Sequence, residues 1–286
     1  MAAKKKGGWA ALPAKAPRFD FGGEALKKHW KALHAGDAEP FPDAKRAAVL
    51  LKAAGKAAPK GLDADALAAA LQEGWRAFHE GRFEAAYEAG VALGPVGASL
   101  ATKAMGIHAA YLVDDDKERL ARFEQVAALA DAAIAALPDE ANSHYRKAFG
   151  LGRYSQGISI LSALKQGLAG KVRECLDRTL SLEPGHAEAR LALAVYHAEI
   201  VSKVGAMIAG LTYGAKASEA EKQLEAALGR MPEAPVAWLE KGNVILLLQG
   251  GKGEDAAAAA YEKAASLKPR DAMEWLDARH AAGLIE

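Results

Sequence analysis

Apolar residues recur along most of this chain at intervals of three and four, the spacing of one face of an α-helix. Val172, Cys175, Leu176, Thr179 and Leu180 share one such face, which predicts that the lone cysteine is a buried core thiol. From residue 62 onward these stretches come in pairs separated by a turn rich in glycine or charge, and no useful alternation predicts a strand. We therefore expect an all-α protein built from antiparallel helical hairpins.

Prolines divide the pattern at intervals of 43, 46, 48 and 37 residues, and each follows a run that ends in Leu or Met within two positions. They are Pro95, Pro138, Pro184, Pro232 and Pro269. Three positions after each proline stands a residue suited to a helix start: Ala98, Ala141, Ala187, Pro235 or Ala272. Recurrence at this period predicts a right-handed solenoid of about five hairpins, closed by a capping helix over residues 272–283.

The last and first hairpins resemble the tetratricopeptide repeat. In the last hairpin the matching residues are Trp238, Gly242, Ala257, Tyr261, Ala264 and Pro269, and in the first they are Gly74, Gly81, Phe83 and Ala86. In this resemblance the small residues let neighbouring helices approach closely, and the aromatic residues fill the volume between hairpins. A packing role accounts for all of them.

The middle hairpins carry about a dozen residues more than the ordinary repeat of 34. Aligning their prolines superposes GISILSALKQGLAG, from Gly157, on VGAMIAGLTYGAKA, around Gly205, and we expect elongated hairpins there. These long hairpins, with a long helix over 117–137 before them, resemble the regulator of microtubule dynamics family across residues 62–276. That resemblance implies protein docking and association with membranes or lipids, and it supplies no binding residue.

The region before Leu62 differs, because Lys and Pro are frequent in it. We expect residues 1–61 to be a tail with two short helices, 23–34 and 43–55, and residues 62–286 to be the repeat domain. Trp30 and Leu33 lie one helical turn apart and are candidates to anchor the tail on the repeats, the alternative being a detached module.

Composition and motifs argue against most chemistry. With 37 basic against 36 acidic side chains, no nucleic-acid partner is expected, and the absence of an apolar signal core after Lys4–Lys6 predicts a cytoplasmic location. No catalytic, phosphate-binding or zinc motif is recognisable, so we expect neither an enzyme nor a cofactor or metal. His29, His34, Asp37 and Glu39 are assigned to a solvated surface, and Asp114–Asp116 to a helix N-cap.

The concave side that such repeats build from the first helix of each pair is the expected binding surface for a protein or peptide. Its candidate residues are Tyr145, Arg146, Phe149, Arg153, Glu188, Leu191, Val195, Glu199 and Asn243. Arg146 and Arg153 are suited to pair with carboxylates, and Tyr145 and Phe149 to supply contact area.

The uncharged hairpin tips suggest an alternative ligand, a lipid or another apolar small molecule held between the elongated hairpins. The apolar contact residues would be Ile158, Ile160, Leu161, Met207, Ile208 and Leu211. Packing of the tips on one another, or on a second subunit in a homodimer, explains the same pattern.

Overall fold

The computed structural model describes residues 8–285, and every regular element within this range is a helix. The contacts divide the chain into two compact units. The first unit holds residues up to 29 and 40–163, and the second holds 30–39 and 164 onward. Residues 40–61 thus belong with the helices that follow them, whereas the short segment 30–39 belongs with the C-terminal half.

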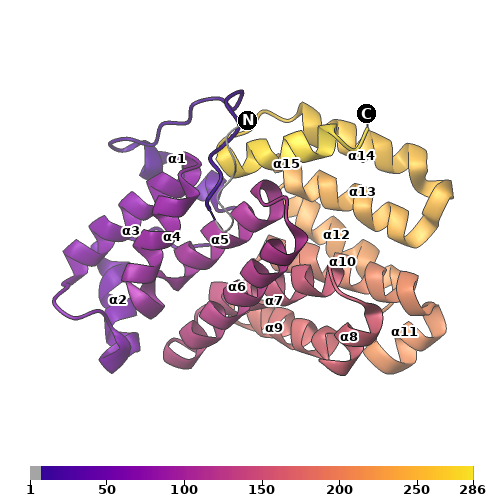
Figure 1. Cartoon of the computed structure of the whole chain (residues 1–286), viewed down its shortest axis with the longest axis horizontal. Coiled ribbons are helices and arrows are strands. Elements are labelled where there is room, and N and C mark those ends of the chain that lie inside the picture. The colour runs from indigo at the N-terminus through magenta and orange to yellow at the C-terminus, as the bar shows by residue number, and fades with distance from the viewer. Residues whose placement is uncertain (1–7, 286) are drawn as a thin grey trace. The chain divides into compact units, whose positions relative to one another are not determined.

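The helices are labelled in Figure 1. Those of the first unit are α2 (Ala44–Ala54), α3 (Ala64–His79), α4 (Phe83–Ala92), α5 (Ala98–Leu112), α6 (Asp116–Ala136) and α7 (Ala141–Gln156). Those of the second are α9 (Leu168–Leu182), α10 (Ala187–Val204), α11 (Ala206–Tyr213), α12 (Ala217–Arg230), α13 (Pro235–Gln249), α14 (Glu254–Ser266) and α15 (Ala272–Ala282). Two helices, α1 (Ala25–Leu33) and α8 (Ile160–Lys165), cross from one unit to the other along the chain.

All five predicted helix starts are confirmed: α5, α7, α10, α13 and α15 begin at Ala98, Ala141, Ala187, Pro235 and Ala272. The expected long helix over 117–137 is α6, and the two short helices of the tail are α1 and α2. These starts could be predicted because proline ends a helix through its own backbone and needs no tertiary partner to do so.

Side chains cap several of these helices. Asp43, Asp63, Asp115 and Asp271 each accept a hydrogen bond from the backbone N–H three residues on, at the starts of α2, α3, α6 and α15. The predicted capping role of the Asp114–Asp116 run is thus confirmed for Asp115. His186 caps α10 in the same way, since its Nδ1 accepts from the Ala189 N–H at 3.0 Å. Each cap satisfies an amide that has no partner inside its helix.

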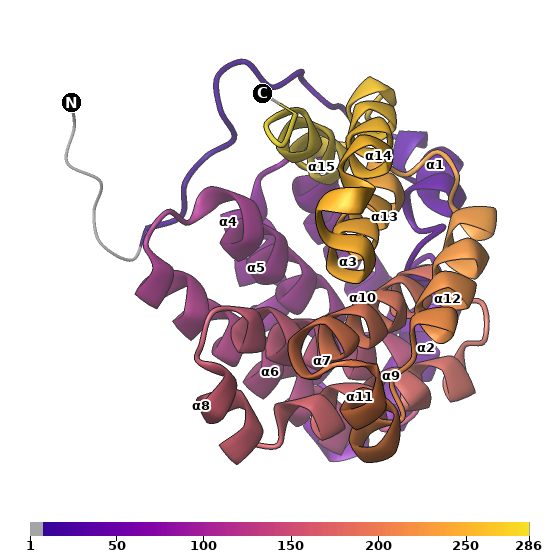
Figure 2. The same cartoon turned by 90° about the vertical axis from the view of Figure 1, so that its right-hand side faces the viewer.

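In the first unit, consecutive helices from α2 to α7 pack against one another (Figure 1 and Figure 2). Trp75, Phe78 and Phe83 are almost fully buried between α3 and its neighbours, and Phe78 meets both of the other rings edge to face. These aromatic contacts join the tail-proximal hairpin α3–α4 into one core.

In the second unit, α10 packs on α12 and α13, and α13 packs on α14 and α15. Gly242 allows the close approach of α13 and α14, because a Cβ at this position would lie 2.3 Å from Cε1 of Tyr261. The last helix, α15, contacts both α13 and α14, the position expected of a terminal cap.

We expected the extra residues of the middle hairpins to elongate those hairpins. Instead of lengthening the flanking helices, these residues form the separate short helices α8 and α11. Gly205 before α11 and Gly214 after it have φ of +80° and +61°, which residues with a Cβ rarely adopt. Helix α8 has a start of its own, because the Ser159 hydroxyl accepts a hydrogen bond from the Ser162 N–H at 3.2 Å. Glycine breaks and a local cap therefore outweigh continuation of the long helices.

The tail of the first unit is packed rather than detached. Helix α2 lies against α3, and the Gln72 side chain donates a hydrogen bond to the Pro42 carbonyl oxygen at 2.8 Å. In the second unit, the segment 30–39 is held by the Glu188 N–H, which donates to the Gly36 carbonyl oxygen at 2.9 Å. Among the residues described, no helix is both long and apolar enough to cross a bilayer.

Candidate functional site

The concave-face candidates on α7 are largely committed to packing. Tyr145 and Arg146 are only 6% and 3% exposed, and the Arg146 guanidinium lies 4.8 Å from the centre of the Tyr145 ring. Phe149 and Arg153 are half-buried, with the Arg153 guanidinium 5.6 Å from the centre of the Phe149 ring. Of the four, only Phe149 and Arg153 are partly exposed to solvent.

The candidates of the second unit also have internal roles. Leu191 is 4% exposed in the core cluster of α10, α12 and α13, and Val195 packs against that cluster. Glu199 pairs with Lys203 at 3.2 Å. Glu188 and Asn243 contact residues of their own unit: the Glu188 side chain lies beside Gly36, and the Asn243 side chain bonds to Glu240 and Tyr261.

The expected nine residues thus fall into two groups, 145–153 in the first unit and 188–243 in the second. Each unit uses most of its members to fill or bond its own interior. Helical spacing groups these residues on one side of each helix but does not distinguish a side turned to solvent from one turned to a neighbouring helix.

The apolar tips are different, because they are exposed. On α11 the exposed fractions are 77% for Met207, 54% for Ile208 and 84% for Leu211. Ala209 on the same helix is fully buried and holds α11 to its unit. Large apolar side chains gathered on one exposed face are unusual at the surface of a monomer and are typical of interaction sites.

Helix α8, taken by itself, has the same character. Ile160 is 53% exposed, Leu161 65% and Leu164 49%, whereas Ile158 in the preceding turn is half-buried. Five of the six apolar contact residues predicted from the sequence are therefore exposed: Ile160, Leu161, Met207, Ile208 and Leu211. Leu164 belongs to the same helix and was missed, although its position four residues after Ile160 places it on the same face.

The tips themselves carry basic but no acidic residues, although Glu199 and Glu219 lie just outside the stretch around α11 and Glu199 pairs with Lys203 at 3.2 Å. No Asp or Glu occurs from Ile200 to Ser218, where the exposed Lys203 and Lys216 stand on either side of α11. Around α8 the exposed Lys165 and Lys171 lie in a stretch, 141–173, that also contains no acidic residue. In a chain with nearly equal numbers of acidic and basic side chains, both tips are locally apolar and basic.

A buried polar pair lies on α10. His197 is 3% exposed, its Nδ1 has no hydrogen-bond partner, and its pKa is lowered by burial and by the positive charge of Arg173. Burial raises the pKa of the adjacent Tyr196. Both side chains are thereby kept neutral at pH 7, which suits the interior of a helical array.

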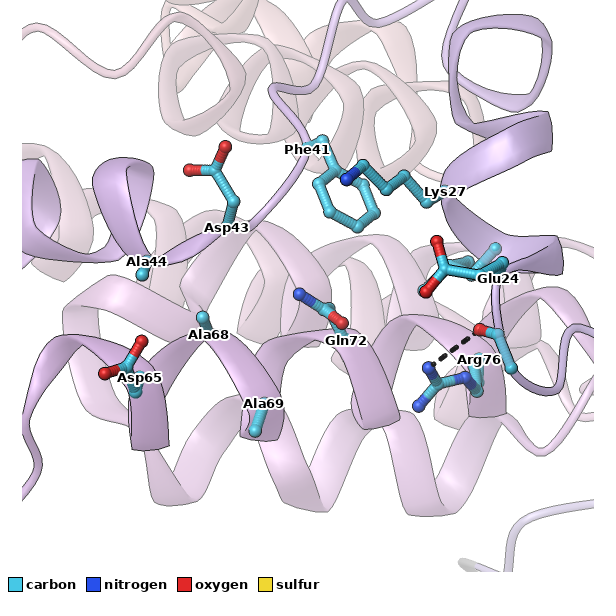
Figure 3. Close-up of a pocket in the computed structure, with 12 residues that line it drawn as sticks. Glu24, Lys27, Phe41, Asp43, Ala44, Asp65, Ala68, Ala69, Gln72 and Arg76 are labelled. Carbon is cyan, nitrogen blue, oxygen red and sulfur yellow. Dashed lines mark hydrogen bonds between the residues drawn. The ribbon is translucent and has the colours of Figure 1, made fainter.

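A groove with a cavity volume of about 350 Å³ lies along α3 in the first unit (Figure 3). Its floor is one face of α3, from Asp65 through Ala68 and Gln72 to Arg76, and its walls are residues 23–27 and 41–44. The polar groups of this groove hold the tail in place: Gln72 donates to the Pro42 carbonyl oxygen, and Arg76 Nε donates to the Phe21 carbonyl oxygen at 3.0 Å. No sequence pattern indicated the groove, because three separate segments build it.

The prediction that His34 and Asp37 lie on a solvated surface is wrong. His34 and Asp37 are 3% and 1% exposed, and Nδ1 of His34 lies 2.8 Å from a carboxylate oxygen of Asp37. The His34 ring stacks on Trp30, with ring centres 4.0 Å apart, so packing buries what spacing alone placed in water. Of the two histidines in that prediction, only His29 is exposed. No group of His, Cys, Asp and Glu side chains suited to a metal occurs between residues 8 and 285.

Comparison with known proteins adds no family assignment. No protein-family model matches this sequence, and no curated protein is significantly similar to it. The resemblances to tetratricopeptide repeats and to the regulators of microtubule dynamics thus rest on the residues quoted above.

Proposed function

We propose that this protein is a non-catalytic binding protein whose exposed apolar helix α11 docks on an anionic lipid surface. The observation that carries the proposal is the exposure of Met207, Ile208 and Leu211 on one short helix. Complete burial of such a side chain is favourable by roughly 1.5–3 kcal/mol, so three of them supply a substantial part of a membrane affinity.

The charges favour lipid over a neutral apolar partner. Lys203, which pairs with Glu199, and Lys216 flank the apolar helix in the sequence, and no Asp or Glu occurs from Ile200 to Ser218 to repel an anionic head group. A basic residue close to an anionic membrane is worth about 1 kcal/mol. An apolar face bordered by lysines is the arrangement of helices that lie in the interface of a bilayer.

The fold fits this role. Pairs of consecutive helices in each unit, such as α6 with α7 and α13 with α14, pack against one another, which supports the proposal of a tetratricopeptide-like solenoid whose first helices carry partners and whose hairpin tips project. Helix α8 has the same combination of apolar exposure and lysines as α11, and it is a second candidate anchor.

Docking of a protein or peptide is the second candidate function, favoured by the half-buried Arg153 above the Phe149 ring on α7. A carboxylate with an apolar neighbour would find both of its contacts there. Replacement of Arg153 by Glu would abolish this interaction and leave lipid binding intact, which separates the two functions in one variant.

Vesicle co-sedimentation tests the proposal. The full chain should sediment with vesicles containing phosphatidylserine and not with pure phosphatidylcholine, and binding should weaken as salt rises, since exposed charges are screened. A variant carrying Met207→Ser and Leu211→Ser should lose at least tenfold in affinity. Val49→Ser is the matched control, because Val49 is 53% exposed on α2, and this variant should bind like the unaltered protein.

Two results would refute lipid docking. The first is equal binding by the double variant and the Val49→Ser control. The second is that the unaltered protein does not bind vesicles and elutes as a dimer, whereas the double variant elutes as a monomer. The apolar tip would then be the contact between two copies of the chain.

A further inference from the structure

The N-terminal segment of the described chain binds the first unit as a peptide ligand binds a receptor. Residues 8–24 form no helix or strand and lead into α1 (Figure 1), and we call them the strap. Two aromatic residues of the strap pack against the unit. One is Phe21, which is buried, donates its N–H to Glu80 at 3.2 Å and places its ring 5.4 Å from that of His79. The other is Trp9.

Trp9 sits in a cradle formed by three side chains from three consecutive helices, namely Tyr87 of α4, His108 of α5 and Arg122 of α6. The centre of its ring lies 5.1 Å from that of Tyr87 and 4.5 Å from that of His108. The Arg122 guanidinium lies 4.9 Å from the centre of the Trp9 ring, within the range of a cation–π contact. The indole is thus contacted by two rings and a cation.

The cradle also binds the backbone on either side of Trp9. The Ala10 N–H donates to Nε2 of His108 at 2.8 Å, and Arg122 donates to the Gly8 carbonyl oxygen at 3.2 Å. One backbone donor and one backbone acceptor are therefore satisfied across a single tryptophan. These contacts are made by the aromatic ring of Trp9 and by the backbone on either side of it.

The side chains of the cradle are themselves held in position. Arg122 is 7% exposed, bonds to Glu118 at 2.7 Å and lies 2.8 Å from Nδ1 of His108, which is fully buried. The Tyr87 hydroxyl accepts a hydrogen bond from Gln125 at 3.0 Å. A receptor whose groups are fixed before the ligand arrives loses little conformational entropy on binding.

We propose that Tyr87, His108 and Arg122 form a recognition site for an extended, tryptophan-bearing peptide, and that the strap of the same chain occupies it as a displaceable intramolecular ligand. The strap competes at the high effective concentration of a tethered segment, so a free peptide binds only when the strap is weakened or displaced. The proposal does not depend on α11, because no residue of that helix takes part.

A labelled peptide with the sequence of residues 8–21 is the probe, and fluorescence anisotropy with the full chain is the measurement. The Trp9→Ala protein, whose strap has lost its indole, should bind the peptide at least tenfold more tightly than the unaltered protein does. A probe in which the tryptophan is replaced by alanine should not bind either protein.

Two further variants test whether binding occurs at the cradle. Trp9→Ala combined with Tyr87→Ala, or with Arg122→Ala, should bind the probe at least tenfold more weakly than the Trp9→Ala protein does. Tyr87 is half-buried, so its replacement leaves the core intact, and the tyrosine variant serves as the test if the arginine variant fails to fold. Lys15→Ala, at an exposed position of the strap, is the matched control and should behave like the unaltered protein.

The proposal is overturned if the Trp9→Ala protein, with an unchanged circular dichroism spectrum, does not bind the probe. It is equally overturned if the unaltered protein binds the probe as tightly as the Trp9→Ala protein does. Vesicle binding by the Trp9→Ala protein reports on α11 separately, so failure of this proposal and failure of lipid docking are distinguishable.

Discussion

The burial of His108 predicts a specific dependence of stability on pH. Its ring nitrogens face the Ala10 N–H and the Arg122 guanidinium, both hydrogen-bond donors; the neutral imidazole accepts a hydrogen bond at one of these nitrogens, and the protonated imidazole accepts at neither. Burial, followed by the positive charge of Arg122, lowers the pKa of His108 from 6.5 to about 4 in the folded protein. The unfolded chain keeps the ordinary value near 6.5.

The sign follows from which state takes up the proton first. As the pH falls below 6.5, the unfolded chain is protonated at His108 while the folded protein is not, so the free energy of unfolding decreases. The loss continues until the pH reaches the folded pKa of about 4. With each pKa unit worth about 1.4 kcal/mol, the decrease attributable to His108 reaches about 2.5 kcal/mol at pH 4.5.

Urea unfolding followed by circular dichroism, from pH 7.5 to 4.5, measures this effect. The comparison protein is His108→Gln, because its amide retains an acceptor and does not titrate. The difference in unfolding free energy between the two proteins should change by about 2.5 kcal/mol over this range, because the unaltered protein loses this much more stability at low pH than His108→Gln does. The carboxylates are the same in both proteins, so their contributions to the difference largely cancel. A difference that stays constant with pH would refute the reasoning.

Three further predictions concern stability, each measured as the shift in the urea midpoint. Gly242→Ala should destabilise by about 1–3 kcal/mol, because its Cβ would lie 2.3 Å from a ring carbon of Tyr261. A loss in the Gly242→Ala, Tyr261→Leu double variant that is smaller than the sum of the two single losses would confirm the clash. Arg270→Ala should cost roughly 2–3 kcal/mol, because it removes the guanidinium from Glu274, which is 4% exposed and whose pKa burial already raises. A Glu274→Gln single variant as stable as the unaltered protein would contradict this account. Leu176→Ala, at a fully buried position of α9, should cost about 2–5 kcal/mol, and a loss below 1 kcal/mol would mean that the core there collapses around the gap.

Much of the helical framework is predictable from the sequence because its signals are local. Pro138 and Ala141 predict the end of one helix and the start of the next within four residues, and α7 does begin at Ala141. The caps at Asp115 and Asp271 likewise act on amides three residues away. Backbone restriction and capping are decided within a single turn, so they need no knowledge of the fold.

The apolar tips were predictable as residues but not as structures. An uncharged stretch such as 204–215 is compatible with packing, with a ligand pocket or with an exposed face. The structure shows Leu211 at 84% exposure on a separate helix, set off by Gly205 and Gly214. Exposure depends on what the remaining helices leave uncovered, and no local pattern contains that information.

The sequence by itself determined an all-helical chain, the starts of the five helices that follow its repeating prolines, and which residues share each helix face. The tertiary structure alone decided that Tyr145, Arg146 and Leu191 are interior, that residues 30–39 pack with the C-terminal half, and that Trp9 fills a cradle on α4, α5 and α6. The reason is range. Helix signals act over three or four residues, whereas the Trp9–His108 contact joins positions 99 residues apart in sequence, and only the packed fold brings them together.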